Sequence, residues 1–113
     1  MRKKIAVPIN NAGILDAHFG HCRYFSLHEI EGEKIVSEEI VQPPAHEPGV
    51  LPRWLADMNV TDVLAGGMGN RAIQHFNQHG VNVFVGAPEM EAKKLVSGYL
   101  DNSIEFSANY CDH

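Results

Sequence analysis

The chain has 113 residues, of which 44% are hydrophobic and 20% are charged, and this composition predicts a single compact domain. The formal net charge of -5, from nine basic and fourteen acidic residues, argues against binding to the phosphate backbone of nucleic acids. No apolar run approaches the roughly 20 residues that a membrane span needs, and Pro8 interrupts the amino terminus before a signal-peptide core forms. We therefore expect a cytoplasmic protein that binds neither nucleic acid nor membrane.

The amino-terminal part of the chain predicts three strands. A β-branched run covers residues 3–9, and residues 23–30 alternate Phe25 and Leu27 with polar neighbours. A turn at Glu31 and Gly32 then leads into a returning strand over residues 34–41. These strands predict an antiparallel meander.

A proline-rich segment separates this meander from the rest of the chain. Residues 42–49 carry three prolines and a glycine, which predicts an exposed loop whose His46 could close over a ligand. From residue 50 to 58 the apolar side chains fall at helical spacing, with Pro52 in the first turn and Trp54 on the apolar side. We expect a short amphipathic helix there.

Strands and helices alternate from residue 60 onward. Residues 60–65 and 81–86 predict strands, and residues 69–80 and 88–100 predict helices, the first ending at Gly80 and the second beginning at Pro88. The order βββαβαβα indicates an α/β fold with a mixed five-stranded sheet and flanking helices. Residues from about 104 onward show no fold-forming pattern, so we expect a flexible tail.

A ligand site is expected at the carboxyl ends of the central strands, where open α/β sheets bind their ligands. If the first strand and residues 60–65 are neighbours, the polar residues after one meet the turn GGMGN after the other. Glycines allow close approach, and the first N–H groups of the following helix favour an anion, although a simple tight turn is the alternative interpretation. The predicted lining consists of Asn10, Asn11, Asp16, Gly66, Gly67, Met68, Gly69 and Asn70.

Two segments carry side chains that bind metals. In DAHFGHCRYF, residues 16–25, they are His18, His21 and Cys22, and near the end of the chain they are Cys111 and His113. If a strand begins near His21, this histidine and Cys22 point to opposite faces, and Cys22 shares a face with Tyr24, Ser26 and His28. Two cysteines are too few for a disulfide framework or for a cluster held by four thiolates. Zinc is an alternative metal, although the chain has no CxxC pair.

Four segments together resemble a known family: KIAVPIN, DAHFGHCRYF, DVLAGGMGNRAIQHF and GVNVFVGA. They are similar to those of the dinitrogenase iron-molybdenum cofactor biosynthesis proteins, which include NifX, NifY, the C-terminal domain of NifB and small stand-alone relatives. The resemblance covers nearly the whole chain, so we expect residues 1–113 to form one domain of this type. It implies a ribonuclease H-like fold and the binding or carrying of an iron-sulfur or molybdenum-containing cluster or its precursor.

Within this family the chain is expected to be a carrier rather than an enzyme. Incomplete ligation suits a protein that receives a cluster from a donor and passes it to an acceptor, or a homodimer that shares one, and Cys22 is the expected principal ligand. One alternative is a phosphoester-processing enzyme that uses Asp16 and His18, although no paired carboxylates are evident. Another is a regulatory or scaffolding module with a vestigial pocket, for which Trp54 would be a contact residue.

Overall fold

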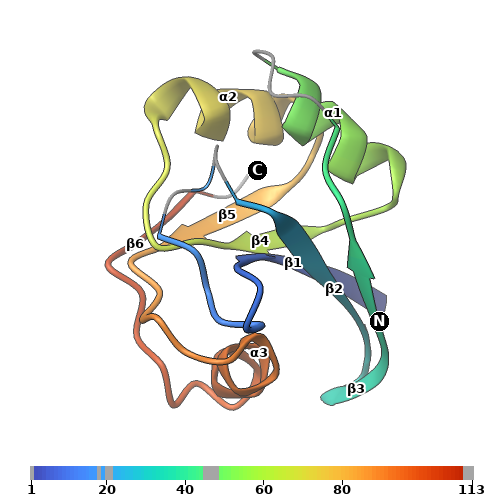
Figure 1. The fold of residues 1–113 in the computed structure, drawn as a ribbon, viewed down its shortest axis with the longest axis vertical. Helices are drawn as coiled ribbons and strands as arrows, with labels where there is room; N and C mark the ends of the chain where they lie inside the picture. The colour runs from blue at the N-terminus through green and yellow to red at the C-terminus, as the bar shows by residue number, and fades with distance from the viewer. Residues whose placement is uncertain (1, 18, 20–21, 45–48, 111–113) are drawn as a thin grey trace.

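The structure is a computed structural model that describes residues 2–17, 19, 22–44 and 49–110. It is an α/β fold in which a mixed sheet carries helices on both faces, as the sequence predicted (Figure 1). The strands lie in the order β3-β2-β1-β4-β5-β6. Their bounds are β1 Arg2–Ile9, β2 Tyr24–Glu31, β3 Lys34–Val41, β4 Asp62–Leu64, β5 Asn82–Val85 and β6 Ala108–Tyr110.

The three amino-terminal strands form the predicted meander. β1 pairs with β2 in antiparallel fashion along its whole length, from Arg2 opposite Glu31 to Ile9 opposite Tyr24. Gly32 turns the chain into β3 with a φ of 66°, a left-handed conformation that favours glycine. This half of the sheet follows directly from the alternation and turn residues in the sequence.

The second half of the sheet is parallel until its last strand. β1 pairs with β4 and β4 pairs with β5, both in parallel, so the expected central neighbours are confirmed. β6 then pairs antiparallel with β5, which makes six strands and shows that the predicted count of five was wrong. This strand lies within the segment expected to be a tail, and with three half-buried or exposed residues it is too short to show an alternation in the sequence.

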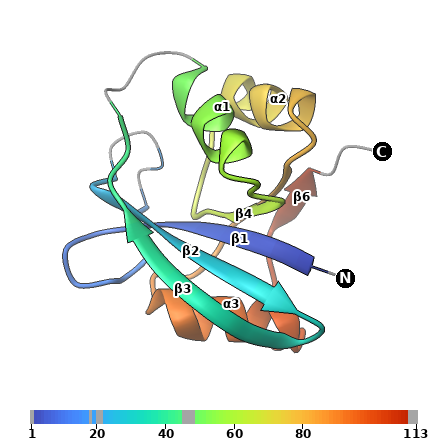
Figure 2. The same cartoon turned by 90° about the vertical axis from the view of Figure 1, so that its right-hand side faces the viewer.

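Helices cover both faces of the sheet, as Figures 1 and 2 show from two directions. Helix α1 (Val50–Asp57) and helix α2 (Asn70–Gln78) lie on one face, and helix α3 (Ala92–Leu100) lies on the other. The apolar core therefore has two parts: Phe25, Leu55 and Phe76 belong to the α1/α2 side, and Ile5 and Leu95 belong to the α3 side. No helix in the described part of the chain is long and apolar enough to cross a membrane.

Helix α3 begins later than predicted. The sequence placed its start at Pro88, but the first helical residue is Ala92. The preceding backbone is instead hydrogen-bonded to the loop after β1: Leu15 N–H donates to the Met90 carbonyl at 3.0 Å, and Ala92 N–H donates to the Gly13 carbonyl at 3.1 Å. These long-range bonds, which leave no local pattern, replace the first helical turn.

Candidate functional site

The carboxyl ends of β1 and β4 bring two loops into contact, as expected for this edge of the sheet. β1 is followed by the loop that contains Asp16, and β4 is followed by the turn Gly66–Asn70. A Cβ atom built on Gly66 would lie 3.5 Å from the Ala17 Cα atom. The two walls of the predicted crevice are therefore adjacent.

Asn10 builds the first wall rather than facing a ligand. Its side-chain oxygen accepts hydrogen bonds from the backbone N–H groups of Ala12 (2.8 Å) and Ile14 (3.2 Å), which closes a turn of the Asx type. Asn11 is exposed in this turn. The chain then returns to β1, where Asp16 N–H donates to the Pro8 carbonyl at 2.9 Å, so that the half-buried Asp16 is held beside the end of the strand.

Two glycines of the second wall have no structural explanation within the fold. Neither Gly67 nor Gly69 has a φ in the left-handed region, so another residue would fit the backbone. A Cβ atom built on either would meet no other atom within 4 Å. The half-buried Met68 between them packs against the α1/α2 core. The turn is thus anchored at its centre and bare on its outer side.

Helix α2 begins immediately after this turn and has an electropositive first turn. Gly69 is its N-cap and provides no side-chain cap. The first turn holds no acidic residue, whereas Arg71 adds a positive charge beside Asn70. The first N–H groups of a helix lack intrahelical acceptors, and the helix dipole places partial positive charge there. This end of α2 favours an anion.

Cys22 lies in the α1/α2 core, two residues before β2, and is only 2% exposed. Burial, together with the nearby Asp16 charge, raises its thiol pKa to about 12. The expectation that Cys22 shares a face with Tyr24 was wrong, because Cys22 lies in the α1/α2 core while Tyr24 packs against the α3 core. β2 begins only at Tyr24, so strand alternation does not extend back to the cysteine.

Phe19 fixes the segment between the first wall and Cys22. Its ring centroid lies 5.6 Å from that of Phe25 and 5.5 Å from that of Phe76, both in edge-to-face geometry. In the described residues, no group of three or more His, Cys, Asp or Glu side chains is arranged to hold a metal ion. The predicted ligands His18, His21, Cys111 and His113, and the predicted lid residue His46, lie outside the described residues.

The last described residue, Tyr110, lies away from the crevice. It pairs with Val83 near the amino end of β5, whereas the glycine turn follows the carboxyl end of the parallel strand β4. The crevice therefore lies at the carboxyl ends of the parallel strands, whereas β6 ends near their amino ends.

The sequence did not single out a buried polar group on the α3 face. His28 is 1% exposed; its Nε2 atom is 2.7 Å from the Ser26 hydroxyl oxygen, and its Nδ1 atom is 3.4 Å from a carboxylate oxygen of Glu38. Burial lowers the pKa of His28, and the Glu38 charge opposes this shift. Strand alternation places Ser26 and His28 on one face, but it does not reveal that loops and α3 bury that face.

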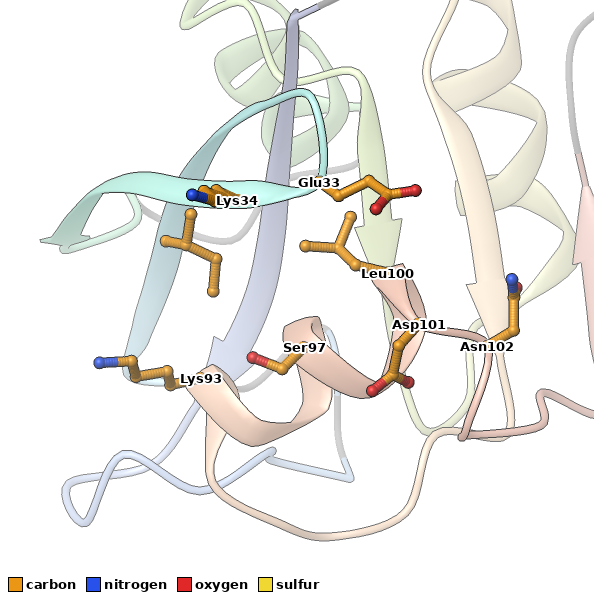
Figure 3. Close-up of a pocket in the computed structure, with 8 residues that line it drawn as sticks. Glu33, Lys34, Lys93, Ser97, Leu100, Asp101 and Asn102 are labelled. Carbon is orange, nitrogen blue, oxygen red and sulfur yellow. The ribbon is translucent and has the colours of Figure 1, made fainter.

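The structure also has a cavity of about 750 Å³ that the sequence did not predict (Figure 3). It lies between the β2–β3 turn and α3, on the face of the sheet that α2 does not cover. The β2–β3 turn is beside the amino end of β1, whereas the glycine turn is at the carboxyl ends of the parallel strands. Its lining mixes both signs of charge and includes Glu33, Lys34, Lys93, Ser97, Leu100, Asp101 and Asn102. It is separate from the crevice.

Comparison with known families decides the assignment. The family model described as "Dinitrogenase iron-molybdenum cofactor" matches residues 1–102. The chain belongs to this family. The resemblance found in the sequence is thereby confirmed. The dinitrogenase iron-molybdenum cofactor family is associated with the formation of that cofactor, in which its members have an accessory role.

Three similar proteins align with most of this family member. An uncharacterized protein of Methanocaldococcus jannaschii, MJ0580, is 36% identical over 86 residues, which cover 72% of each chain. The crystal structure of PH0822 is 30% identical, covers 92% of this chain and 94% of its own, and superposes with a TM-score of 0.83. The apo form of the orange protein from Desulfovibrio gigas, at 22% identity, covers 94% and 93% with a TM-score of 0.77 and shows a similar fold.

Proposed function

We propose that this family member binds an anionic iron-sulfur or molybdenum-iron-sulfur cluster, or its precursor, as cargo at the turn Gly66–Asn70. The observation that carries the proposal is the pair of bare glycines, Gly67 and Gly69, at the start of a helix without a side-chain cap. Bridging sulfides and molybdate-type oxygens accept hydrogen bonds, so they suit exposed backbone N–H groups and the Arg71 charge. Asp16 and Ala17 form the facing wall.

We assign the direct metal bond among the described residues to Cys22. Thiolate is the usual protein ligand of iron-sulfur clusters. The neutral, buried thiol must lose its proton when it binds a metal, and it must leave the apolar contacts that it makes in the free protein. Such a ligand holds cargo weakly enough to release it, which agrees with a carrier that exchanges clusters between donor and acceptor proteins, as a monomer or as a homodimer.

A hydrolytic enzyme is less well supported. Asp62, the buried carboxylate of the sheet, lies at the start of β4, away from the crevice. Both of its oxygens accept hydrogen bonds, one from the Thr61 hydroxyl at 2.8 Å and the other from the Asn82 side chain at 3.0 Å. This carboxylate therefore braces two parallel strands, and we propose a non-catalytic protein whose topology is of the ribonuclease H-like type.

The scaffolding alternative also loses its main feature. Trp54 is half-buried and packs edge-to-face on Phe25, with ring centroids 5.9 Å apart. Its packing is explained by the α1/α2 core. Trp54 is therefore a core residue of α1 rather than an exposed contact for a partner.

Gly69→Val tests the cargo site. The Cβ atom of a valine there would meet no protein atom within 4 Å and the backbone φ suits a non-glycine residue, so the variant should fold. Anaerobic reconstitution with iron, sulfide and molybdate should load the variant at least about tenfold more weakly than the parent, which corresponds to about 1.4 kcal/mol. Metal analysis and visible absorption measure the loading.

Gln74→Val is the matched control, because it places the same side chain at an exposed position of α2 outside the turn. It should load like the parent protein. Equal loading of the folded Gly69→Val variant and the parent would reduce the turn to a connector and would refute this site.

A further inference from the structure

A second chemical feature lies at the opposite end of α2. His75 and His79 are four residues apart at the carboxyl end of this helix, within the sequence HFNQH. Side chains four residues apart are neighbours on a helix surface, and two histidines at this spacing bind zinc in metalloproteases. Here Phe76 follows the first histidine, where those enzymes carry a glutamate base. The spacing therefore provides ligands without the hydrolytic group.

The tautomer of His79 leaves Nε2 available as a metal ligand. Its Nδ1 atom lies 2.8 Å from the His75 carbonyl oxygen, and a carbonyl can only accept a hydrogen bond. Nδ1 must therefore carry the proton, so the lone pair of the neutral ring is on Nε2. Metal-binding histidines commonly donate their other N–H to a carbonyl in this way, which fixes the ring orientation. His79 is also exposed to solvent.

The His75 ring lies near Gly49, the residue before α1. A Cβ atom built on Gly49 would lie 3.6 to 3.9 Å from Cε1, Nδ1 and Nε2 of His75, so the nitrogen-bearing edge of the ring faces a residue without a side chain. Gly49 has a φ of 80°, which favours glycine at this position. The ring nitrogens of His75 have no hydrogen-bond partner among the described residues.

The electrostatic environment at this end of α2 also favours a cation. The carboxyl end of a helix carries partial negative charge. Residues 72–80 contain neither lysine nor arginine, although Arg71 lies one turn before His75, and the whole chain has a net charge of -5. The two ends of α2 therefore differ in the sign of the ion that they favour.

We infer that His75 and His79 form a chelating site for a divalent transition-metal cation of the zinc, nickel, cobalt or copper class. Since no third His, Cys, Asp or Glu among the described residues completes the set, water fills the remaining positions. Affinity should follow the order Co²⁺ < Ni²⁺ < Cu²⁺, with Zn²⁺ below Cu²⁺, and Mg²⁺ and Ca²⁺ should not compete, because they prefer oxygen ligands. This site does not depend on the proposed cluster site.

Titration of the full-length protein with Zn²⁺ tests the inference. Calorimetry gives the affinity, and histidine-ring NMR spectra identify the nitrogens that bind; the metal-free His79 ring should be protonated at Nδ1. We expect the Nε2 signals of His75 and His79 to move together. His75→Ala and His79→Ala should each weaken Zn²⁺ binding at least about tenfold.

Two further variants separate ligation from folding. His79→Asn keeps a side-chain donor at the end of α2 but removes the imidazole, so it should fold and still lose Zn²⁺ binding. Gln78→Ala, at the adjacent exposed position, should bind like the parent. Unchanged Zn²⁺ affinity in the His75→Ala/His79→Ala double variant would place the metal elsewhere and would overturn the inference, whatever the result of cluster reconstitution.

Discussion

At the scale of single residues, the environment of Cys22 decides its chemistry. An exposed cysteine ionises readily, but Cys22 is buried in the core that contains Phe19 and Phe25, and the Asp16 charge is nearby. A metal must therefore displace a proton from a thiol whose pKa has been raised to about 12. Metal binding by Cys22, the ligand expected from the sequence, should therefore depend on pH.

Cluster loading should rise with pH if Cys22 is the direct ligand. At any pH well below its pKa of about 12, binding releases one proton, so the apparent affinity should increase about tenfold per pH unit. Reconstitution of the parent protein between pH 7 and pH 9, followed by metal analysis, measures this slope. Cys22→Ala should load less cluster and should lose the pH-dependent component, whereas identical profiles for the two proteins would remove Cys22 from the ligand set.

His28 should make the stability of the fold sensitive to acid. Its pKa in the folded protein is below the ordinary value of 6.5, mainly because it is buried, so the unfolded chain binds the proton more readily. The stabilisation is complete above pH 6.5 and is lost as the pH falls toward the folded pKa, at up to about 1.4 kcal/mol per pH unit. Urea unfolding at several pH values checks this.

His28→Gln provides the comparison, because it keeps a polar side chain near Ser26 and Glu38 but does not titrate. Below pH 6.5 the unfolding free energy of the variant should depend less steeply on pH than that of the parent. Parallel slopes would show that other groups dominate the acid response.

At the scale of elements, β6 depends on aromatic packing that lies outside the strand. Phe106 lies 5.7 Å from the Phe84 ring and 5.9 Å from the Tyr99 ring, measured between centroids. Ser107 N–H then donates to the Val85 carbonyl at 3.0 Å, which aligns the following residues with β5. The segment is held by tertiary contacts rather than by its own strand propensity.

Phe106→Ala should lower the free energy of unfolding by about 1–3 kcal/mol, because it removes a half-buried ring and its two aromatic contacts. Chemical denaturation measures the loss, and amide exchange at Val83 and Val85, which face β6, should become faster as β6 detaches. Glu105→Ala, at the neighbouring exposed position, should change the stability little. A parent-like Phe106→Ala variant would mean that the pairing of β6 with β5 does not depend on the Phe106 ring.

Local patterns predicted most elements but not their tertiary attachments. The β1–β3 meander and the position of α2 follow from alternation, helical spacing and glycine turns, whereas the pairing of β1 with β4, on which the expected site depended, has no local signal. The late start of α3 and the existence of β6 depend on bonds between distant segments, which leave no periodic signal. The same reason explains the site: the sequence indicated the glycine turn, but not the burial of Cys22.

At the scale of the whole molecule, the sheet separates its chemistry by face and by edge. The proposed cluster site lies at the carboxyl ends of β1 and β4 on the α2 side. The His75 and His79 pair lies at the far end of the same helix, and the His28 group lies on the α3 face. Each can therefore be altered by mutation without direct contact with the others, which keeps the experiments above independent.

In the free protein, the loop between Asn10 and Asp16 is already hydrogen-bonded within itself, to β1 and to the segment at the start of α3. The Asn10 side chain closes its turn, Asp16 is tied to Pro8, and Gly13 and Leu15 are tied to the backbone before and at the start of α3. The conformational entropy of this wall is consequently lost when the chain folds, and it need not be lost again at each binding event. At the proposed site, preorganisation of this kind would let cargo enter and leave with little rearrangement of the loop, so exchange should be fast even at modest affinity.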